Sequence, residues 1–343
     1  MPSPLVDQQE RRGSPKPIPE AFTDTSQYPE GVSQVQNRRE VAIETRNLTK
    51  SYGHVDAVRG VDLDVRRGEV FAMLGPNGAG KTTTVEMLEG HRSRTGGEAR
   101  VLGFDPARGE RDFKQRIGIV LQETGVQPYL TVEEAIEMYR GYYPEPLEVG
   151  HIIELVGLEG ERTRRVNRLS GGQKRRLDVG IGLAGDPELL FLDEPTTGFD
   201  PSARRNAWQM FAGLQRLGKT IFLTTHYMEE AQRLADRVAI IVDGRIIAVG
   251  APETLAGDGA RSTTVSFRLT SHQASLPEGI DRMAVKEGDR VTVRTGEPVR
   301  LLHDLTGWAL DRHVELEDLS VTRPSLEDVY LQLTSEAERP THE

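Results

Sequence analysis

The sequence contains no cysteine and no long apolar run. The absence of cysteine from 343 residues excludes disulfides, thiolate-bound zinc and thiol nucleophiles, and it is compatible with a reducing compartment. No window approaches about 18 consecutive apolar residues, so we expect no membrane-spanning helix. The N-terminus lacks the basic and apolar regions of a signal peptide, and none is expected.

Positive charge is also in deficit. The chain has 43 Lys and Arg residues against 53 Asp and Glu residues, a net charge of −10. This balance argues against a broad electrostatic surface for nucleic acid, so we expect no nucleic-acid partner. With 36% hydrophobic residues and 35 glycines the composition is typical of globular proteins, and the length allows two or three domains.

The pattern along the chain changes three times. Residues 1–38 are proline-rich and polar, which predicts a disordered N-terminal tail. Apolar and acidic residues alternate over 61–65, as in a half-buried antiparallel strand. Unbroken apolar runs then predict strands of a parallel sheet covered by helices on both faces: 70–74, 189–192, 220–224 and 238–242. We therefore expect one α/β domain over residues 39–255.

A second, smaller unit is expected over residues 256–343. A turn signal at 257–259 predicts a linker. Residues 264–269 and 290–294 alternate as strands do, and residues 299–310 have a helical pattern. Ser325 is expected to open another helix, with an apolar stripe that ends at Leu333.

A phosphate-binding motif follows the apolar run 70–74 directly. Residues 75–82 match G-x-x-x-x-G-K-[ST] in full, in the strand-to-helix context that the motif requires. Glycines there let backbone N–H groups surround phosphate oxygens at a helix N-terminus, and the lysine and threonine would bind phosphates and Mg²⁺. The alternative is a glycine-rich turn that contains Lys-Thr by chance. The nucleotide-binding residues expected here are Gly75, Pro76, Asn77, Gly78, Ala79, Gly80, Lys81, Thr82 and Thr83.

Two carboxylates end the apolar run 189–192. Asp193 occupies the position where such a protein needs a carboxylate for Mg²⁺, and Glu194 could polarise the attacking water as a general base. A solvated acidic pair after a strand is the alternative. A second phosphate-binding helix start is predicted at Ser170, Gly171, Gly172 and Gln173, where serine can cap the helix. Such a segment alone is more often a simple loop.

Taken together, residues 41–255 resemble the ATP-binding subunit of an ABC transporter. Residues 169–173 match the family signature letter for letter, and Asp193 and Glu194 match its second Walker motif. The resemblance implies that Tyr52 stacks on adenine and that Gln122 senses the γ-phosphate and binds Mg²⁺. It implies that His226 is the switch histidine, and that residues 198–201, with Asp200, form the dimer-contact loop. Phe199 stands where the family more often has leucine and keeps an apolar side chain.

The resemblance implies a P-loop α/β fold with a parallel core sheet, an antiparallel β flap and a helical subdomain at about 123–168. ATP and Mg²⁺ are the implied cofactors. The catalytic residues would be Glu194, His226 and Gln122, and Thr82, Gln122 and Asp193 would bind the metal. The lysine loop and the signature loop of one chain cannot reach the same γ-phosphate. A two-fold axis would bring each loop to its complement in a second copy or a paralogous subunit.

A separate membrane-spanning permease is the implied partner, and the chain would act at the cytoplasmic face of the membrane. Residues 101–106, 226–231 and 323–330 resemble the daunorubicin-resistance ATPases, which energise drug and lipid exporters. In that subfamily the C-terminal domain supports dimer contact, although its apolar stripe could simply form its own core.

Two other functions compete. A soluble ABC ATPase acting on nucleic acid or ribosomes usually has two ATP modules, a long coiled coil or cysteine-rich insertions, none of which is seen here. A non-hydrolytic regulatory subunit would more naturally have lost Glu194 or His226.

Overall fold

A computed structural model describes residues 41–121, 125–255, 263–269, 276–322 and 330. Four expected features lie outside the described residues: the N-terminal tail, Gln122, the linker at 257–259 and most of the helix from Ser325. Within the described part of the chain, no helix is both long and apolar enough to cross a bilayer.

A six-stranded sheet forms the centre of the first unit, in the order β5-β6-β7-β3-β8-β9. Neighbouring strands are parallel except β9, which pairs antiparallel with β8. The four apolar runs of the sequence form four of these strands, as predicted. The strands are β3 (Val70–Leu74), β5 (Ile117–Val120), β6 (Leu189–Asp193), β7 (Thr220–Thr225), β8 (Arg237–Val242) and β9 (Arg245–Gly250).

Strand β3 shows why these runs are unbroken. All five of its residues are buried, and they alternate between two hydrophobic clusters. Val70, Ala72 and Leu74 belong to the cluster on one face of the sheet, and Phe71 and Met73 to the cluster on the other. Because successive side chains of a strand point to opposite faces, a strand covered on both sides needs apolar residues at every position.

An antiparallel sheet of three strands, β2-β1-β4, covers one face. Strands β1 (Val41–Tyr52) and β2 (Val55–Arg66) form the flap expected from the alternation at 61–65. The third strand, β4 (Gly96–Val101), comes from beyond helix α1 (Lys81–Leu88) and was not expected. Its sequence, Gly-Gly-Glu-Ala-Arg-Val, carries a weak apolar alternation.

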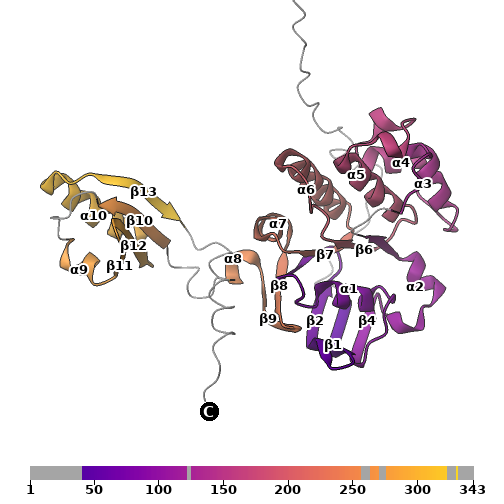
Figure 1. Ribbon diagram of the computed structural model, residues 1–343, viewed down its shortest axis with the longest axis horizontal. Coiled ribbons are helices and arrows are strands. Elements are labelled where there is room, and N and C mark those ends of the chain that lie inside the picture. Colours follow the sequence, from indigo (N-terminus) through magenta and orange to yellow (C-terminus); the bar gives the residue numbers. More distant parts are fainter. Residues whose placement is uncertain (1–40, 122–124, 256–262, 270–275, 323–329, 331–343) are drawn as a thin grey trace, which may run out of the picture.

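Helices cover the opposite face (Figure 1). Helix α3 begins with a capping box between Thr131 and Glu134. Figure 1 shows α3, α4 and α5 gathered on the far side of the six-stranded sheet from β1, β2 and β4. The helices of this unit are α2 (Arg111–Gln115), α3 (Val132–Arg140), α4 (Val149–Leu155), α5 (Gly171–Gly182), α6 (Pro201–Arg216), α7 (Met228–Leu234) and α8 (Pro252–Leu255), with 3₁₀ turns η2 (Pro106–Arg108), η3 (Glu159–Glu161) and η4 (Val166–Arg168).

The C-terminal unit has the strand order β11-β12-β10-β13, all antiparallel. Its β-α-β-β-α-β sequence of elements is that of a ferredoxin-like fold. Val265, Phe267 and Val293 on the sheet pack with Leu301 and Leu305 on its long helix. The elements are β10 (Thr263–Leu269), α9 (Glu278–Asp281), β11 (Ala284–Glu287), β12 (Arg290–Thr295), α10 (Pro298–Arg312) and β13 (Leu316–Thr322).

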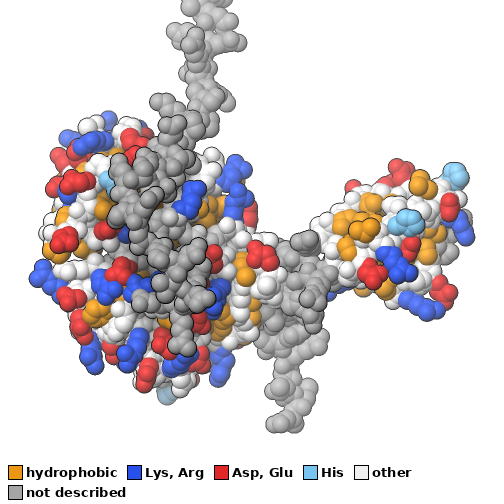
Figure 2. Space-filling model, turned by 180° about the vertical axis from the view of Figure 1, so that it is seen from behind, with side chains coloured by type: hydrophobic (Ala, Val, Ile, Leu, Met, Phe, Trp, Pro, Cys, Tyr) orange, Lys and Arg blue, Asp and Glu red, His pale blue; other side chains and the backbone are white. Residues whose placement is uncertain are grey.

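Two features of the whole chain bear on function. Tyr330 is half-buried and packs against the helix-covered cluster of the first unit, so the chain returns there after β13. On the face seen in Figure 2, positive and negative side chains are interspersed over both units rather than separated by sign.

Candidate nucleotide site

The loop between β3 and α1 borders a hollow of about 350 Å³. Residues from this loop and helix line it together with Ala57 and Glu194: Asn77, Gly78, Gly80, Lys81, Thr82 and Thr83. Two glycines of the loop are required by close packing. A Cβ atom at Gly75 would lie 2.3 Å from the Ile241 carbonyl oxygen, and one at Gly80 would lie 2.4 Å from that of Ala57. Gly80 also has φ +98°, where other residues are strained.

Lys81 is the cation of this hollow. Its side chain is only 5% exposed, and Nζ donates to the carbonyl oxygens of Gly75 at 2.9 Å and Pro76 at 3.1 Å. The same Nζ lies 3.5 Å from Glu194 Oε1. The loop thus holds a buried ammonium group beside backbone N–H groups at a helix N-terminus, an arrangement suited to phosphate oxygens.

Asp193 contacts the first residues of helix α1. Thr82 Oγ1 donates to Asp193 Oδ2 at 3.4 Å, and the Thr224 hydroxyl donates to Oδ1. A hydroxyl and a carboxylate that face each other are hard oxygen donors of the kind that Mg²⁺ prefers, so these residues fit that ion. Sequence analysis missed Thr224, although a threonine near the carboxyl end of a buried apolar strand was a usable signal.

Glu194 is held from several sides. Its backbone has φ +44°, a strained value for a residue other than glycine, and its N–H donates to Thr224 Oγ1 at 3.0 Å. Thr197 Oγ1 donates to Glu194 Oε2 at 3.1 Å. His226 Nδ1 lies 3.2 Å from Glu194 Oε1, an ion-pair distance without the geometry of a well-formed hydrogen bond.

These neighbours determine the protonation of Glu194. Burial is the largest single influence and would raise the pKa of the carboxyl. His226, Lys81 and Thr197 together outweigh it, so the pKa of Glu194 lies below its usual range. The carboxylate is therefore ionised at neutral pH, as a proton acceptor must be.

The signature segment lies at a different hollow, also of about 350 Å³. Ser170 caps helix α5 as predicted, because Gln173 N donates to Ser170 Oγ at 3.3 Å and Ser170 N donates to Gln173 Oε1 at 2.9 Å. Asp200 caps α6 in the same way, accepting from Ser202 N and Ala203 N. Both segments line this second hollow: Ser170, Gly171, Gly172, Gln173, Arg176, Gly198, Phe199, Asp200, Ser202, Ala203 and Asn206.

The structure therefore divides the predicted site residues into groups. Glu194 lines the hollow of the lysine loop, where Asp193 contacts Thr82 and His226 contacts Glu194. The signature segment and Asp200 line the other hollow. Tyr52 ends β1 with its side chain 40% exposed, and Lys50 Nζ and the Arg92 guanidinium lie 5.1 and 5.3 Å from its ring centre. The Tyr52 ring therefore lies near two cationic side chains, and it does not line the hollow.

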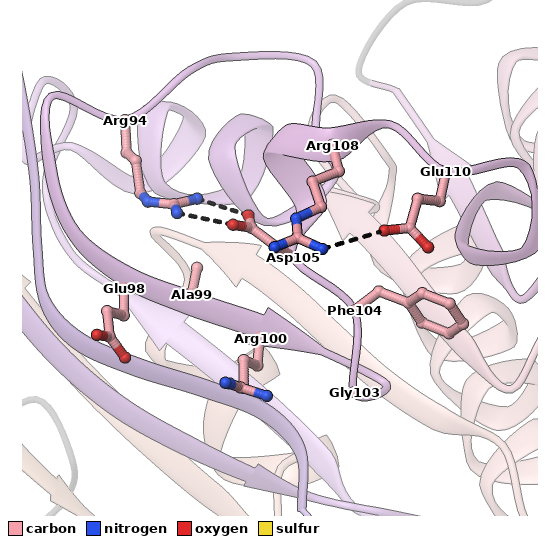
Figure 3. Close-up of a pocket in the computed structure, with 9 residues that line it drawn as sticks. All are labelled: Arg94, Glu98, Ala99, Arg100, Gly103, Phe104, Asp105, Arg108 and Glu110. Atoms are coloured by element: carbon pink, nitrogen blue, oxygen red, sulfur yellow. Dashed lines mark hydrogen bonds and ion pairs between the residues drawn. The ribbon is translucent and has the colours of Figure 1, made fainter.

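A third hollow, of about 470 Å³, lies beside β4 (Figure 3). Figure 3 shows Arg94 turned toward Asp105, to which it donates two hydrogen bonds of 2.7 and 2.9 Å. Arg94 lowers the pKa of Asp105 to about 2. Arg108 lies 3.9 Å from Glu110. These four charges are paired with one another, which indicates that they stabilise the turn after β4.

Comparisons with known proteins agree with this geometry. Residues 58–197 match the family described as "ABC transporter", and residues 263–325 match "ABC transporter domain-containing protein-like, C-terminal domain". The daunorubicin resistance ATP-binding protein DrrA2 of Streptomyces coeruleorubidus is 36% identical over 310 residues, which span 85% of this chain and 95% of that protein. The chain belongs to the ABC transporter ATP-binding proteins. It is an ATPase with a P-loop α/β fold, so the predicted fold class is confirmed.

Other relatives in the ABC family have similar coverage. The Nod factor export ATP-binding protein I of Burkholderia lata is 36% identical, over 85% of this chain and 96% of that protein. The linearmycin resistance ATP-binding protein LnrL of Bacillus subtilis is 33% identical, over 85% and 98%. The predicted resemblance to drug-exporter ATPases is therefore confirmed.

Solved structures of ABC proteins share the fold of the first unit. CbiO1 from Clostridium perfringens, part of the transporter complex cbiONQ, aligns with a TM-score of 0.58 at 27% identity and covers 64% of this chain and 92% of that one. The cassette MJ0796, solved as a dimer bound to ADP and phosphate, aligns with a TM-score of 0.55 at 25% identity over 61% and 98%.

Proposed function

We propose that this ABC ATPase powers export of a drug-like, antibiotic-like or lipid-like compound through a separate membrane-spanning permease. The names of three relatives support export: daunorubicin resistance, linearmycin resistance and Nod factor export. The chain would then work at the cytoplasmic face of the membrane, bound to its permease.

One observation carries the proposal. The hollow at the lysine loop and the hollow at the signature segment are separate on one chain, and each contains only one of the two segments expected to bind phosphate. A two-fold axis would join the lysine loop of one copy to the signature segment of another and give two equivalent sites. ATP would stabilise this closed pair, and loss of the γ-phosphate contact would let it open.

Within each composite site we assign roles by position. Lys81 and the loop N–H groups would hold the β- and γ-phosphates, while Thr82 and Asp193 would hold Mg²⁺. Glu194 would accept a proton from the attacking water, and His226 would orient water and γ-phosphate. Tyr52 would stack on the adenine base. Gln122 would reach the γ-phosphate and Mg²⁺.

The other parts of the chain would transmit motion. The helical subdomain at about 123–168 would dock the permease, and Tyr129, which is 72% exposed, is suited to that contact. The domain over 256–343 would support dimer contact. Its exposed apolar side chains support this role: Met283, Val285, Val299 and Leu310.

Cell fractionation separates this function from the competing one. We expect the chain to sediment with membranes when its permease is present and to be released when the permease gene is deleted. Growth of the same strains on a panel of drugs would identify the compound. Sedimentation with ribosomes or nucleoid, unchanged by loss of the permease, would favour a soluble ABC ATPase.

A further inference from the structure

A buried carboxylate outside the nucleotide hollow has no role in the proposed mechanism. Glu230 on α7 is 0% exposed. Its Oε1 accepts hydrogen bonds from Thr196 Oγ1 at 2.8 Å and from Trp208 Nε1 at 3.2 Å. Its Oε2 is buried and has no hydrogen-bond partner among the described residues. Burying a carboxylate costs several kcal/mol, and an apolar residue of the same size often gives a more stable protein.

Glu230 and its two hydrogen-bond partners belong to three different segments. Along the chain Thr196 lies two residues after Glu194, which lines one hollow, and four before Asp200, which lines the other. Trp208 lies on α6, the helix that Asp200 caps. Glu230 itself lies four residues after His226, on the helix that begins just beyond it. Figure 1 shows α7 beside α6, so one carboxylate links all three segments.

A buried arginine also holds the backbone of this segment. Arg175 on α5, the helix of the signature segment, is 7% exposed and donates to the carbonyl oxygens of Asp193 at 2.9 Å and Pro195 at 3.1 Å. It also donates to the carbonyl oxygen of Leu121, which precedes Gln122. Residues 193–196 are thus held by hydrogen bonds to Arg175 on one helix and to Glu230 on another.

We propose that Glu230 is a positioning residue that keeps the segment from Glu194 to Asp200 in a fixed relation to His226. The inference rests on the proposed function, because it assigns these segments to one composite site. Glu230 lines neither hollow. Its loss should therefore misplace catalytic groups while leaving the nucleotide-binding groups in place. A misplacement of about 1 Å by a change remote from the reacting atoms can reduce the rate about 100-fold.

The test compares Glu230→Ala with Glu230→Gln in the full chain. We expect Glu230→Ala to lower kcat for ATP about tenfold or more while KM changes less than about threefold. Glu230→Gln keeps an oxygen acceptor for Thr196 and Trp208 and should restore most of kcat. Thr196→Val removes one donor with little change of shape, and Trp208→Phe removes the other donor but also leaves a cavity in the core. They should each lower kcat several-fold, and they provide the test if Glu230→Ala does not fold.

Glu69 offers a matched control, because it is a buried carboxylate remote from both hollows. It is 1% exposed, accepts a hydrogen bond from Arg66 N at 2.6 Å and pairs with Arg237. Glu69→Gln should change the melting temperature but not kcat. The proposal is overturned if Glu230→Ala keeps kcat within twofold, if Glu230→Gln is as impaired as Glu230→Ala, or if Glu69→Gln lowers kcat equally for an equal loss of melting temperature.

Glu194→Gln, measured in parallel, tests the proposed function separately. If Glu194→Gln abolishes turnover and Glu230→Ala does not reduce it, only the positioning role fails. If Glu194→Gln turns over at the normal rate, the catalytic assignment itself fails.

Discussion

Glu194 lies between two positively charged or chargeable side chains at one edge of a sheet. Lys81 Nζ lies 3.5 Å from its Oε1 and His226 Nδ1 lies 3.2 Å from the same atom. These neighbours keep the pKa of Glu194 low despite its burial. The carboxylate is therefore available as a base at neutral pH, and we expect this role to be lost only when the pH falls below the usual range of a glutamate pKa.

Replacement of Glu194 by glutamine tests this role. We expect Glu194→Gln to lower kcat at least about 100-fold, since general bases contribute about 10²–10⁴-fold. Binding of ATP should persist, because Lys81 and the loop N–H groups remain in place. Phosphate release and equilibrium nucleotide binding would be measured on the same preparation. A variant with the normal rate would remove Glu194 from its assigned role.

For single residues, the sequence predicted those that belong to a local motif. The lysine loop, Asp193 and the cap at Ser170 could each be predicted from a local pattern. Glu230 and Arg175 could not, because their partners lie between 18 and 54 residues away along the chain. A buried charge on an amphipathic helix resembles a solvated one until its neighbours are known.

Among the elements, the loop before α1 depends on close approach of backbone to backbone. Gly75→Ala would place a Cβ atom 2.3 Å from the Ile241 carbonyl oxygen, so the loop must shift. We expect loss of ATP binding and a lower melting temperature, measured by nucleotide titration and thermal unfolding. Unchanged ATP affinity would contradict the view that this packing shapes the loop.

Gly307 provides the control for that substitution. It lies within α10, and an added Cβ there meets nothing within 4 Å. Gly307→Ala should raise the free energy of unfolding by about 0.5–1 kcal/mol, because alanine is the better helix former, and ATP binding should not change.

The ion pair beside β4 predicts a pH dependence of stability. Arg94 holds the pKa of Asp105 at about 2, below the ordinary value of 3.8. A lowered folded-state pKa means that the stabilisation is complete above about pH 4 and is lost as the pH falls toward 2. Asp105→Asn should therefore reduce the free energy of unfolding by about 1 kcal/mol at pH 7. Urea unfolding at several pH values should show this difference shrinking below pH 4; a constant difference would contradict the pairing.

The elements themselves could be predicted to very different degrees. Strands β3, β6, β7 and β8 are covered on both faces and therefore have continuous apolar sequences. Strand β4 was missed because it is an edge strand that starts with two glycines. Its identity as a strand comes from pairing with β1, about 50 residues earlier in the chain.

On the scale of the whole molecule, the separation of the two hollows is the central feature. The sequence predicted that the lysine loop and the signature segment lie apart on one chain, and the folded chain assigns them to two hollows with defined lining residues. The strand order of the C-terminal unit likewise depends on pairing between β10 and β13, whose paired residues lie about 50 positions apart in the chain. Local sequence patterns predict neither the lining of the two hollows nor this strand order.

The most direct test mixes two chains with complementary defects. Lys81→Ala removes the cation from one hollow, and Gly171→Asp, where an added Cβ has open space, places a negative charge at the other. Each chain alone should be inactive, because every site of its dimer has one defect. In a mixed dimer one site has both defects and the other has none. With random pairing at equal amounts the mixture should therefore recover about a quarter of the normal ATPase rate. A mixture no more active than its parents would contradict a site shared between two copies.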